Sequence, residues 1–413
     1  MLARLRNSQG IAMVVVIAMV LVLLSITGAA LLLSGLNLKV ASNMRTGMPL
    51  IQVADAGIQH ALATVSQGTI LPNVAWVLET NVVSTTTFPT GSGYSYVVTA
   101  VNGPATNQAT LTSTANGPNS SKAVVQAVVE RRLLPSVPGA FNGLGEVEPY
   151  FSGDGFQIDG RDYTLANALS GTNPDKLGIS VGDITSPSAQ TPTGAKNAVI
   201  NALDSSQKDN VQGLGYVASP VTSSVDIDNS LTKQATTDLV NSLKGIADCY
   251  FTVKTGGDVT GQINNSTDAS NNITINGKAC NMGTTGSPKI VFFEGLPAGT
   301  TGEQRLIFGG NITGAGILVM KDNDLQFLGQ LNWKGLVIVS GPDTSVSFEG
   351  GANAQDVLGG LIVSETDTDS GYIELYVTST NLRIRSSKEA LDMVQSMLNG
   401  KAYLKIVAWK QNM

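Results

Sequence analysis

The stretch from Ile11 to Leu38 contains no charged residue and consists mostly of Val, Leu, Ile, Met and Ala. As a helix rising about 1.5 Å per residue, it exceeds the roughly 30 Å hydrocarbon core of a membrane. The apolar region of a cleaved secretory signal is shorter, at about 7–15 residues. A helix is also the structure in which a single segment satisfies its own backbone polar groups in lipid. The stretch therefore predicts a membrane-spanning helix, which we place at residues 11–36.

The remaining composition favours an exported, β-rich protein. Ser, Thr, Asn and Gly are abundant, and aromatic residues make up only 5% of the 413 residues. A chain of this length suggests two or three domains. Charged residues contribute 14%, with a formal net charge of −6. This balance argues against nucleic-acid binding, because that function needs a basic face.

The segment before the apolar stretch ends in Asn7-Ser8-Gln9-Gly10, directly before Ile11. This junction resembles the site at which prepilin peptidase cuts pilins and pseudopilins. The resemblance implies a cytoplasmic leader at 1–10, cleavage after Gly10, and Ile11 as the N-methylated first residue of the mature chain. The alternative is an uncut signal anchor with an incidental glycine. Nearby cations give no orientation, because two precede the span and two follow it: Arg4, Arg6, Lys39 and Arg45.

Beyond the span, the chain resembles the PilX-type minor pilins. Asn43-Met44-Arg45 and then Val53-Ala54-Asp55-Ala56-Gly57-Ile58 are similar to the helix continuation of that family, with its A-E/D-A-G stretch. The resemblance implies one pilin helix over 11–67 and makes Arg45 and Asp55 candidates for subunit contacts. Apolar residues also keep helical spacing on one face, which would pack on a globular head: Leu50, Val53, Ala54, Ile58, Ala61, Leu62 and Val65.

One position departs from the pilin pattern. Most filament-forming pilins carry Glu at the fifth mature residue, which here is Val15. In that family the Glu is thought to neutralise the N-terminal amine of a neighbouring subunit, and an unpaired buried charge is costly. Val15 therefore argues against a repeating major pilin and for a tip-type minor pilin packed through its apolar helix. The alternative is that Val15 only extends the span.

Three runs of alternating residues follow, at 94–101, 109–114 and 123–132. Clusters of Asn, Gly and Pro separate them, which is typical of an antiparallel meander. We therefore expect residues 68–132 to form an antiparallel β head beside the long helix, as the pilin resemblance also implies.

The next two segments are distinguished by composition. Prolines at 135 and 138 make residues 133–150 a predicted linker, because proline favours extended backbone and breaks strands. Residues 151–284 are predicted to be a mixed insert of strands and surface loops, with a helical stretch at 231–246.

A repeat occupies residues 285–370. An apolar-x-Phe-x-Gly pattern recurs about every 20 residues, and each copy is followed by a Gly-led apolar strand. This period, with two short strands per unit, predicts the rungs of a β-solenoid; a β-sandwich with hairpins of similar length is the alternative. The repeated positions are Phe308, Phe327 and Phe348, and then Gly316, Gly335 and Gly360.

The last segment, 371–413, is predicted to cap the solenoid. Ser386-Ser387-Lys388-Glu389 opens a helix that Asn399-Gly400 can end. A final strand at Tyr403 to Trp409 would then shield the open end from edge-to-edge pairing. The predicted fold class is thus α+β: a long N-terminal transmembrane helix with an antiparallel head, followed by a β-rich C-terminal domain.

The chain has two cysteines, Cys249 and Cys280, and one histidine, His60. These are too few for a four-ligand zinc site. The cysteines can close one disulfide in an oxidising compartment, and a pair of buried free thiols is the alternative. A Ser-His-Asp triad would have to use His60, which lies in the predicted helix. We therefore expect neither an enzyme nor a bound cofactor.

Two acidic clusters are candidates for calcium, which takes several oxygen ligands from a compact loop. Neither cluster has EF-hand spacing, so solvated turn carboxylates are the favoured interpretation, and the second cluster is the better candidate. The first consists of Asp154, Asp159 and Asp162, and the second of Glu365, Asp367 and Asp369.

Together, these features predict a structural subunit: a minor pilin of a type IV pilus, in a tip or assembly-priming complex. It would span the inner membrane once, with a large periplasmic or extracellular region. The expected partners are prepilin peptidase, other minor and major pilins, the inner-membrane assembly platform and a tip adhesin. The alternatives are a GspK-like pseudopilin of type II secretion and a pilus-mounted adhesin that binds a surface or polysaccharide. An exposed row of aromatic or acidic residues would support the adhesin. Trp333 and Phe327 are candidates, although burial within the solenoid rungs is the favoured interpretation for both.

Overall fold

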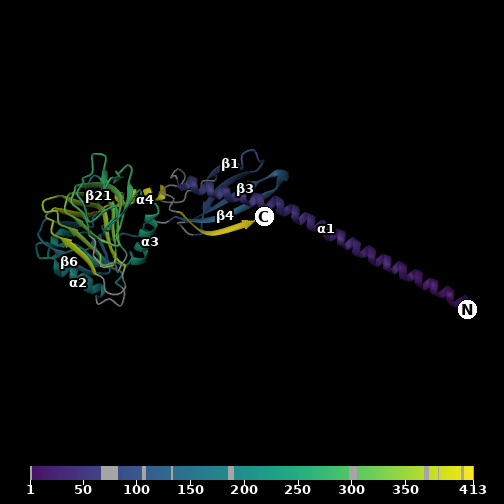
Figure 1. Ribbon diagram of the computed structural model, residues 1–413. Helices are drawn as coiled ribbons and strands as arrows, with labels where there is room; N and C mark the ends of the chain where they lie inside the picture. The colour runs from purple at the N-terminus through teal and green to yellow at the C-terminus, as the bar shows by residue number, and fades with distance from the viewer. Residues whose placement is uncertain are drawn as a thin grey trace. The chain divides into compact units, whose positions relative to one another are not determined.

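The computed structural model divides the chain into two compact units (Figure 1). The helix–sheet unit comprises Met1–Arg132 and Ala402–Met413, and the stacked-sheet unit comprises Leu133–Lys401. The structure describes residues 2–66, 82–104, 108–131, 134–184, 190–296, 305–366, 372–379, 381–400 and 404–412.

Helix α1 (Leu2–Ser66) is 65 residues long and runs without a break through Pro49. Its second half buries one face against the sheet of the helix–sheet unit, whereas Val16–Leu38 buries nothing. The buried positions recur at three- and four-residue intervals, which places them on one stripe of the helix. The predicted apolar stripe is confirmed for five residues: Leu50, Val53, Ala54, Ile58 and Ala61. Leu62 packs partly buried beside them, and the side chain of Val65 lies outside the described residues.

The sheet of this unit has five strands in the order β1-β2-β3-β4-β26, and every neighbouring pair is antiparallel. Buried and half-buried residues alternate along β2 and β3, because one face of each strand packs on α1. Strands β2, β3 and β4 nearly coincide with the three alternating runs of the sequence. The bounds are β1 Val83–Thr87, β2 Ser95–Asn102, β3 Gln108–Asn116, the 3₁₀ turn η1 Pro118–Ser120, β4 Lys122–Arg131 and β26 Leu404–Asn412.

Gly57 lies where α1 comes closest to this sheet. A methyl group on its Cα would overlap the hydroxyl of Ser113 and the ring of Tyr96. Because packed cores tolerate little added volume, the helix can approach β2 and β3 this closely only with glycine at that position. Close packing of α1 on the sheet therefore explains why position 57 is a glycine.

Strand β26 corrects the prediction for the C-terminal segment 371–413. It pairs antiparallel with β4, from Leu404 opposite Arg131 to Asn412 opposite Val124. The predicted cap of the stacked strands is therefore the edge strand of the other unit. The physical reason is that β4 alternates Ala and Val toward the α1 core and leaves an edge that another strand can pair with. The stacked-sheet unit is consequently an insertion between β4 and β26.

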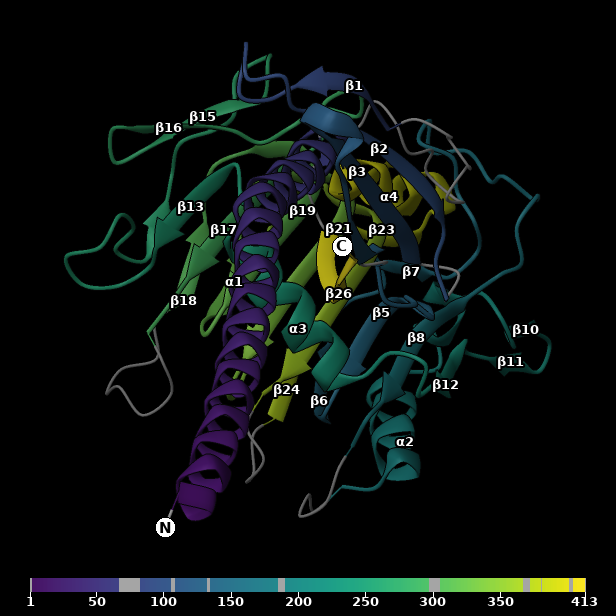
Figure 2. The ribbon, with the colours of Figure 1, turned by 90° about the vertical axis from the view of Figure 1, so that its right-hand side faces the viewer.

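The stacked-sheet unit contains two large sheets whose strands pair in parallel. The eleven-stranded sheet has the order β12-β8-β5-β23-β21-β19-β17-β13, with β25, β7 and β9 attached beside β23; Figure 2 shows its central strands side by side. The six-stranded sheet has the order β14-β18-β20-β22-β24-β6. Residues of both sheets belong to one continuous hydrophobic core.

The strands of the larger sheet are β5 Gly139–Leu144, β7 Gln157–Asp159, β8 Leu177–Gly182, β9 Val211–Gln212, β12 Val225–Ile227, β13 Cys249–Thr252, β17 Lys289–Glu294, β19 Ile312–Lys321, β21 Leu331–Gly341, β23 Gln355–Glu365 and β25 Leu382–Ser386. Those of the smaller sheet are β6 Glu146–Phe151, β14 Gln262–Ile263, β18 Arg305–Phe308, β20 Asp324–Phe327, β22 Ser345–Phe348 and β24 Tyr372–Val377. Two hairpins are separate: β10 Val217–Ala218 with β11 Val221–Thr222, and β15 Asn272–Ile275 with β16 Lys278–Asn281.

The repeated Phe positions form a ladder through the core. Phe308 stands opposite Phe327 in register, and Phe327 opposite Phe348. Their rings stack with centroids 5.5 and 5.4 Å apart. The repeat thus brings equivalent residues into contact, as stacked units of one period require.

The repeated glycines also align, with one correction. Gly316 pairs with Gly335, and Gly335 pairs with Gly359, not with the predicted Gly360. All three aligned glycines have φ between 123° and 138°, a region that side-chain-bearing residues rarely adopt. The backbone conformation therefore selects Gly359.

The predicted boundaries at residues 150, 284 and 370 do not separate compact units. The predicted linker 133–150 contains β5 and β6, which pair in parallel with β23 and β24. Strand β13, from the predicted insert, pairs with β17 of the predicted repeat. The reason is burial: apolar strands such as β5, with all its residues buried, continue the stack across these boundaries.

Three helices accompany the strands. α3 (Lys233–Lys244) lies within the predicted helical stretch 231–246, and α4 (Lys388–Gly400) begins at the predicted capping box. Both pack on strands of the larger sheet. α4 therefore covers β19, β21 and β23 instead of closing an end of the stack. α2 (Pro192–Ala202) lies in a segment expected to be loop; Thr191 caps it and Pro192 is its first residue. A 3₁₀ turn, η2 (Lys208–Asn210), follows.

Deleting residues 402–413 tests the assignment of β26. We expect amides of β4 to lose protection from hydrogen exchange, because β26 is their partner strand, and amides of β25 to keep theirs. Hydrogen exchange, measured by mass spectrometry on the full chain and on the variant that lacks residues 402–413, shows which strand loses protection. Lys410→Ala, an exposed change that leaves the backbone ladder intact, is the control. Loss of protection in β25 instead of β4 would restore the capping assignment.

Candidate functional site

The first candidate site is the exposed apolar half of α1. Val16–Leu38 is 23 residues long, has a mean hydropathy of 2.8 and is 0% buried. At about 1.5 Å per residue it extends about 35 Å, enough to cross the hydrocarbon core. By length and composition it is the one helix of the described residues that can cross a membrane.

The polar side chains inside this segment are satisfied locally where the structure describes their bonds. Thr27 Oγ1 donates to the carbonyl of Leu23 at 2.7 Å, and the hydroxyl of Ser25 donates to the carbonyl of Leu21. These bonds keep the hydroxyls paired without water. The apolar side chains point in all directions around the helix and are between 48% and 72% exposed, as at Val20 and Leu32. A surface of this kind is stable only against lipid or other apolar helices.

The residues predicted to act in processing and packing all lie in α1. The side chains of Gly10, Ile11, Val15 and Arg45 lie outside the described residues, so their roles stay predictions. Asp55 is half-buried on the part of α1 that packs on the sheet.

His60 lies on the same helix with its ring against Tyr96. Its Nδ1 is 2.8 Å from the Tyr96 hydroxyl, and the two rings meet edge to face. This contact joins α1 to β2 inside the helix–sheet unit. The contact gives His60 a packing role within this unit.

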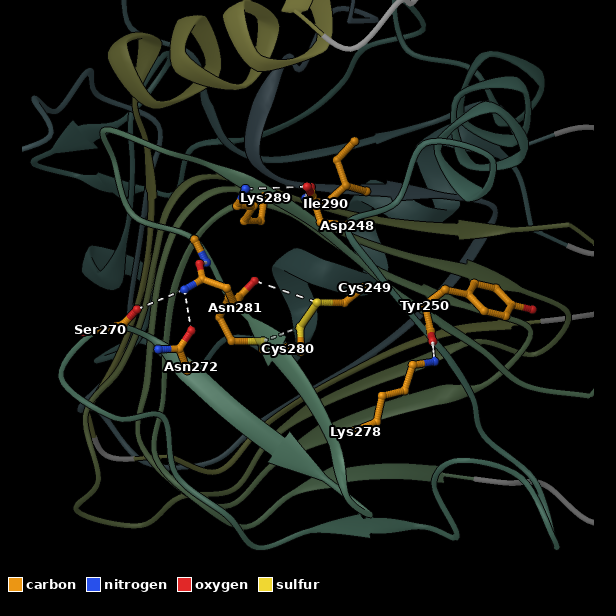
Figure 3. Close-up of a disulfide and its surroundings, with 12 residues drawn as sticks. Asp248, Cys249, Tyr250, Ser270, Asn272, Lys278, Cys280, Asn281, Lys289 and Ile290 are labelled. Atoms are coloured by element: carbon orange, nitrogen blue, oxygen red, sulfur yellow. Dashed lines mark hydrogen bonds and ion pairs between the residues drawn. A yellow bond between two sulfur atoms is a disulfide. The ribbon is translucent and has the colours of Figure 1, made fainter.

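Cys249 and Cys280 form a disulfide between β13 and β16, with their Cα atoms 5.8 Å apart (Figure 3). β13 is the last strand of the larger sheet, and β16 belongs to the β15–β16 hairpin. Lys278 Nζ donates to the carbonyl of Tyr250 at 2.5 Å, and Asn281 donates to Asn272 Oδ1 at 2.6 Å. The disulfide and these bonds hold the hairpin against the edge strand, which protects that edge.

The disulfide closes a loop with a sequence separation of 31. In the chain-entropy model, a loop of this size contributes roughly 3–4 kcal/mol to stability. We expect reduction to lower the denaturation midpoint of the stacked-sheet unit, read by intrinsic fluorescence. The double variant Cys249→Ala with Cys280→Ala should unfold early in either redox state and be insensitive to reductant. A wild-type midpoint that reductant leaves unchanged would contradict this.

The predicted calcium residues do not converge on a site in the described residues. Asp154 accepts from Ser206 Oγ at 3.0 Å, whereas Asp159 is paired with Arg161 at 2.6 Å. Asp162 accepts from Asn173 and from the backbone of Lys388 instead. In the second cluster, Glu365 lies 3.5 Å from Lys233 Nζ, and Asp367 and Asp369 lie outside the described residues. Within the described ranges, no group of three or more His, Cys, Asp or Glu could hold a metal.

The Glu365 carboxyl group of the second cluster is buried. Burial raises its pKa, and the charge of Lys233 opposes that rise only in part. A protonated or ammonium-paired carboxyl is a poor calcium ligand. The described part of this cluster therefore supports a structural role.

Sequence reasoning missed two charged networks in the stacked-sheet unit. In the first network, the fully buried Asp159 accepts hydrogen bonds from Arg161 and, at 2.7 Å, from the Tyr163 hydroxyl. Arg385 is 3% exposed and lies over the Tyr163 ring. Its guanidinium also forms an ion pair with Asp356 at 2.5 Å. In a buried setting, removal of one partner of such a pair costs about 3–5 kcal/mol. No pattern in the sequence indicates this network, because its residues come from β7, the segment after it, β23 and β25, which lie far apart in the chain.

The second network surrounds Glu294 at the end of β17. Burial by itself raises the pKa of this carboxyl, but hydrogen bonds from Lys244, Tyr250 and Lys321 outweigh burial and lower the pKa to about 2. Lys244 lies 2.6 Å and Lys321 3.2 Å from its oxygens. The Glu294 carboxylate therefore stays charged and joins α3, through Lys244, to strand β19, through Lys321.

A row of tyrosines and glutamates, exposed on β6 and half-buried on β24, lies at one edge of the smaller sheet. Tyr150 stands opposite Tyr376 and Glu148 opposite Glu374, in register on β6 and β24. The tyrosine rings are 5.9 Å apart, and Tyr150 is 52% exposed. The charge of Glu374, then burial and the charge of Glu148, raise the pKa of Tyr376. We call these four residues the tyrosine–glutamate row.

The two aromatic residues proposed from the sequence as ligand contacts are buried. Trp333 is 0% exposed and Phe327 is 1% exposed. Trp333 Nε1 donates to the carbonyl of Gly316 at 3.3 Å, and Phe327 belongs to the Phe ladder. The favoured interpretation, burial within the stacked strands, is therefore confirmed for both residues. A strand places alternate residues on opposite faces, and these two face the core.

No family model matches the chain, and no curated protein matches it. The chain is similar to the crystal structure of the competence-associated pilin ComZ from Thermus thermophilus, with 14% sequence identity over 88% of this chain and 97% of that chain. The TM-score is 0.25, which is too low for the match to support an assignment of fold or function.

Proposed function

We propose that this protein is a membrane-anchored structural subunit of the pilin type, acting as a minor pilin of a type IV pilus. One observation carries the proposal: a single helix is fully exposed and apolar over Val16–Leu38 and then buries a stripe of its second half against an antiparallel sheet. The first half needs lipid or neighbouring helices, and the second half fixes a folded head to it.

The same helix can serve in two environments. In the membrane, lipid covers the apolar side chains of Val16–Leu38. After extraction, equivalent helices of neighbouring subunits would cover them, with apolar burial as the driving force. The absence of an acidic side chain at Val15 favours a minor position at the tip or in the priming complex. Prepilin peptidase, other pilins and the assembly platform are the partners that this role requires.

We further propose that the stacked-sheet unit is a β-solenoid carried by the pilin-like unit. The Phe and Gly ladders and the parallel pairing of β19, β21 and β23 support this assignment. Because the unit is inserted between β4 and β26, two chain segments join it to the helix–sheet unit. A pseudopilin of the GspK kind remains the alternative within the same class.

Processing of the N-terminus tests the proposal. When the full chain is coexpressed with a prepilin peptidase, we expect the mature N-terminal peptide to begin with methylated Ile11, read by mass spectrometry. Gly10→Val should abolish cleavage, because a β-branched side chain replaces the small residue at the junction. Gly28→Val, deeper in α1 with open space around it, is the matched control and should leave cleavage unchanged.

An intact Met1 in the presence of active peptidase, or a cut beyond Leu38, would overturn the pilin proposal. In that case the chain would be an ordinary anchored or secreted β-rich protein. Cleavage after Gly10 with no incorporation into pili would retain the pathway and favour the pseudopilin alternative.

A second function, a binding module mounted on the anchor, is favoured by the tyrosine–glutamate row. Two tyrosine rings side by side offer stacking surfaces, and the exposed Glu148 carboxylate offers hydrogen-bond acceptors for hydroxyl groups. Pro149 lies between Glu148 and Tyr150 on β6, the last strand of that sheet. It has no N–H for edge pairing, so the edge beside the row resists the addition of another strand. A neutral, hydroxyl-rich polysaccharide fits this chemistry.

Co-sedimentation with insoluble neutral polysaccharides tests the second function. We expect the double variant Tyr150→Ala with Tyr376→Ala to lose binding by tenfold or more, because it removes both stacking surfaces. Tyr216→Ala, at a half-buried tyrosine elsewhere in the unit whose hydroxyl donates to Asp209, is the control and should bind as wild type. Equal binding by all three proteins would rule out the row as the binding surface.

A further inference from the structure

A groove with a cavity volume of about 250 Å³ lies on the larger sheet of the stacked-sheet unit. It runs across four neighbouring strands near their first residues: β19, β21, β23 and β25. One polar residue from each strand lines it, in the order Thr313, Asn332, Asp356 and Arg383. These four stand in register opposite one another, so they form a polar ladder across the sheet.

The ladder has a defined length and spacing. Neighbouring strands lie about 4.8 Å apart, so the distance from the first residue to the last is about 14 Å. Gln330 and Asn381, from the turns that precede β21 and β25, line the same groove. The groove thus presents a hydroxyl, three amides, a carboxylate and a guanidinium along one line.

The outer polar side chains of the groove have unused hydrogen-bonding capacity. Within the described residues, no partner is recorded for the side chains of Thr313, Gln330, Asn332, Asn381 and Arg383. Amides elsewhere in the unit are used differently: Asn142, for example, binds the backbone of Gly139 and Leu361 through both ends of its side chain. A concentration of unpaired amides in a concave site is what recognition of a polar ligand requires.

The inner wall of the groove contains buried atoms that also lack a partner. Gln355 is 0% exposed; its Nε2 donates to the carbonyls of Phe327 and Gly329, and its Oε1 has no partner. Asp356 Oδ2 binds Arg385, while its Oδ1 is buried and has no partner. Unsatisfied buried polar atoms are rare in folded proteins and call for an unseen partner such as a ligand or water.

The charge of the groove selects the class of ligand. Asp356 is neutralised by Arg385 at 2.5 Å, which leaves Arg383 as the uncompensated charge of the lining. An exposed guanidinium offers two parallel N–H donors, a geometry that matches a carboxylate. The local positive charge contrasts with the formal net charge of −6 of the whole chain.

From these observations we propose that the groove binds an oligosaccharide that carries carboxylate groups, that is, a uronate-containing glycan. Sugar hydroxyls both donate and accept hydrogen bonds, as do the amides of Gln330, Asn332 and Asn381. The carboxylate of one sugar unit lies against Arg383, and hydroxyls of the following units extend along the ladder toward Thr313. The site is separate from the tyrosine–glutamate row, and the proposal does not depend on processing after Gly10.

Calorimetric titration of the full chain in detergent micelles with oligogalacturonate tests the proposal. We expect saturable binding that Arg383→Gln weakens at least tenfold, because the charge-assisted bond is lost. Asn332→Asp, which adds a negative charge to the middle of the ladder, should weaken it similarly. Both residues are exposed, so the fold is retained, which circular dichroism verifies. Arg305→Gln, an exposed arginine on the smaller sheet, is the matched control and should bind as wild type.

Two further titrations identify the ligand class. A neutral galactose oligomer of the same length should bind at least tenfold more weakly than the uronate, and inorganic sulfate alone should not compete at equal concentration. Any of four results would overturn the proposal. These are equal affinity for the neutral oligomer, full competition by sulfate, a loss of affinity in Arg305→Gln equal to that in Arg383→Gln, or no binding of oligogalacturonate. None of these outcomes bears on whether the N-terminus is processed at Ile11.

Discussion

The stacked-sheet unit depends on the parallel, in-register pairing of strands that are too short to bury an apolar face alone. Each pair of strands in the repeat gains its core only by lying on the next pair, as the contacts between Phe308, Phe327 and Phe348 illustrate. Parallel sheets must also be covered on both faces. α3 and α4 provide that cover on β21 and β23, and these two strands are buried along almost their whole length.

Stacking of this kind leaves open edges, and the chain covers them with its own distant segments. β5 and β6, at the start of the unit, pair beside β23 and β24, which come more than 200 residues later. At the other edge, the disulfide between Cys249 and Cys280 holds a hairpin against β13. An unprotected parallel edge would be a template for aggregation. The same need for a partner strand accounts for β26, which completes the antiparallel sheet of the other unit.

The polar groups of the stacked-sheet unit divide into two kinds. The carboxylates of Asp159 and Glu294 are paired, and the pKa of Glu294, lowered to about 2, reflects three hydrogen bonds to that carboxylate. Those that line the groove, including Asn332 and Arg383, are unpaired within the described residues. Pairing rigidifies the fold, whereas unpaired donors and acceptors in a concave surface are available to a ligand.

The sequence by itself determined the features that depend on neighbouring residues. The apolar helix, the buried stripe from Leu50 to Ala61, the three alternating runs and the Phe repeat were readable because helix and strand periods are local properties. Tertiary structure alone decided which segments pair: that β26 belongs with β4, that β5 extends the stack, that Gly359 aligns with Gly335, and that Arg385 meets Asp356. Strand pairing and buried ion pairs join residues that lie far apart in the chain. Composition and local spacing describe only neighbouring residues, so they do not predict which distant segments meet.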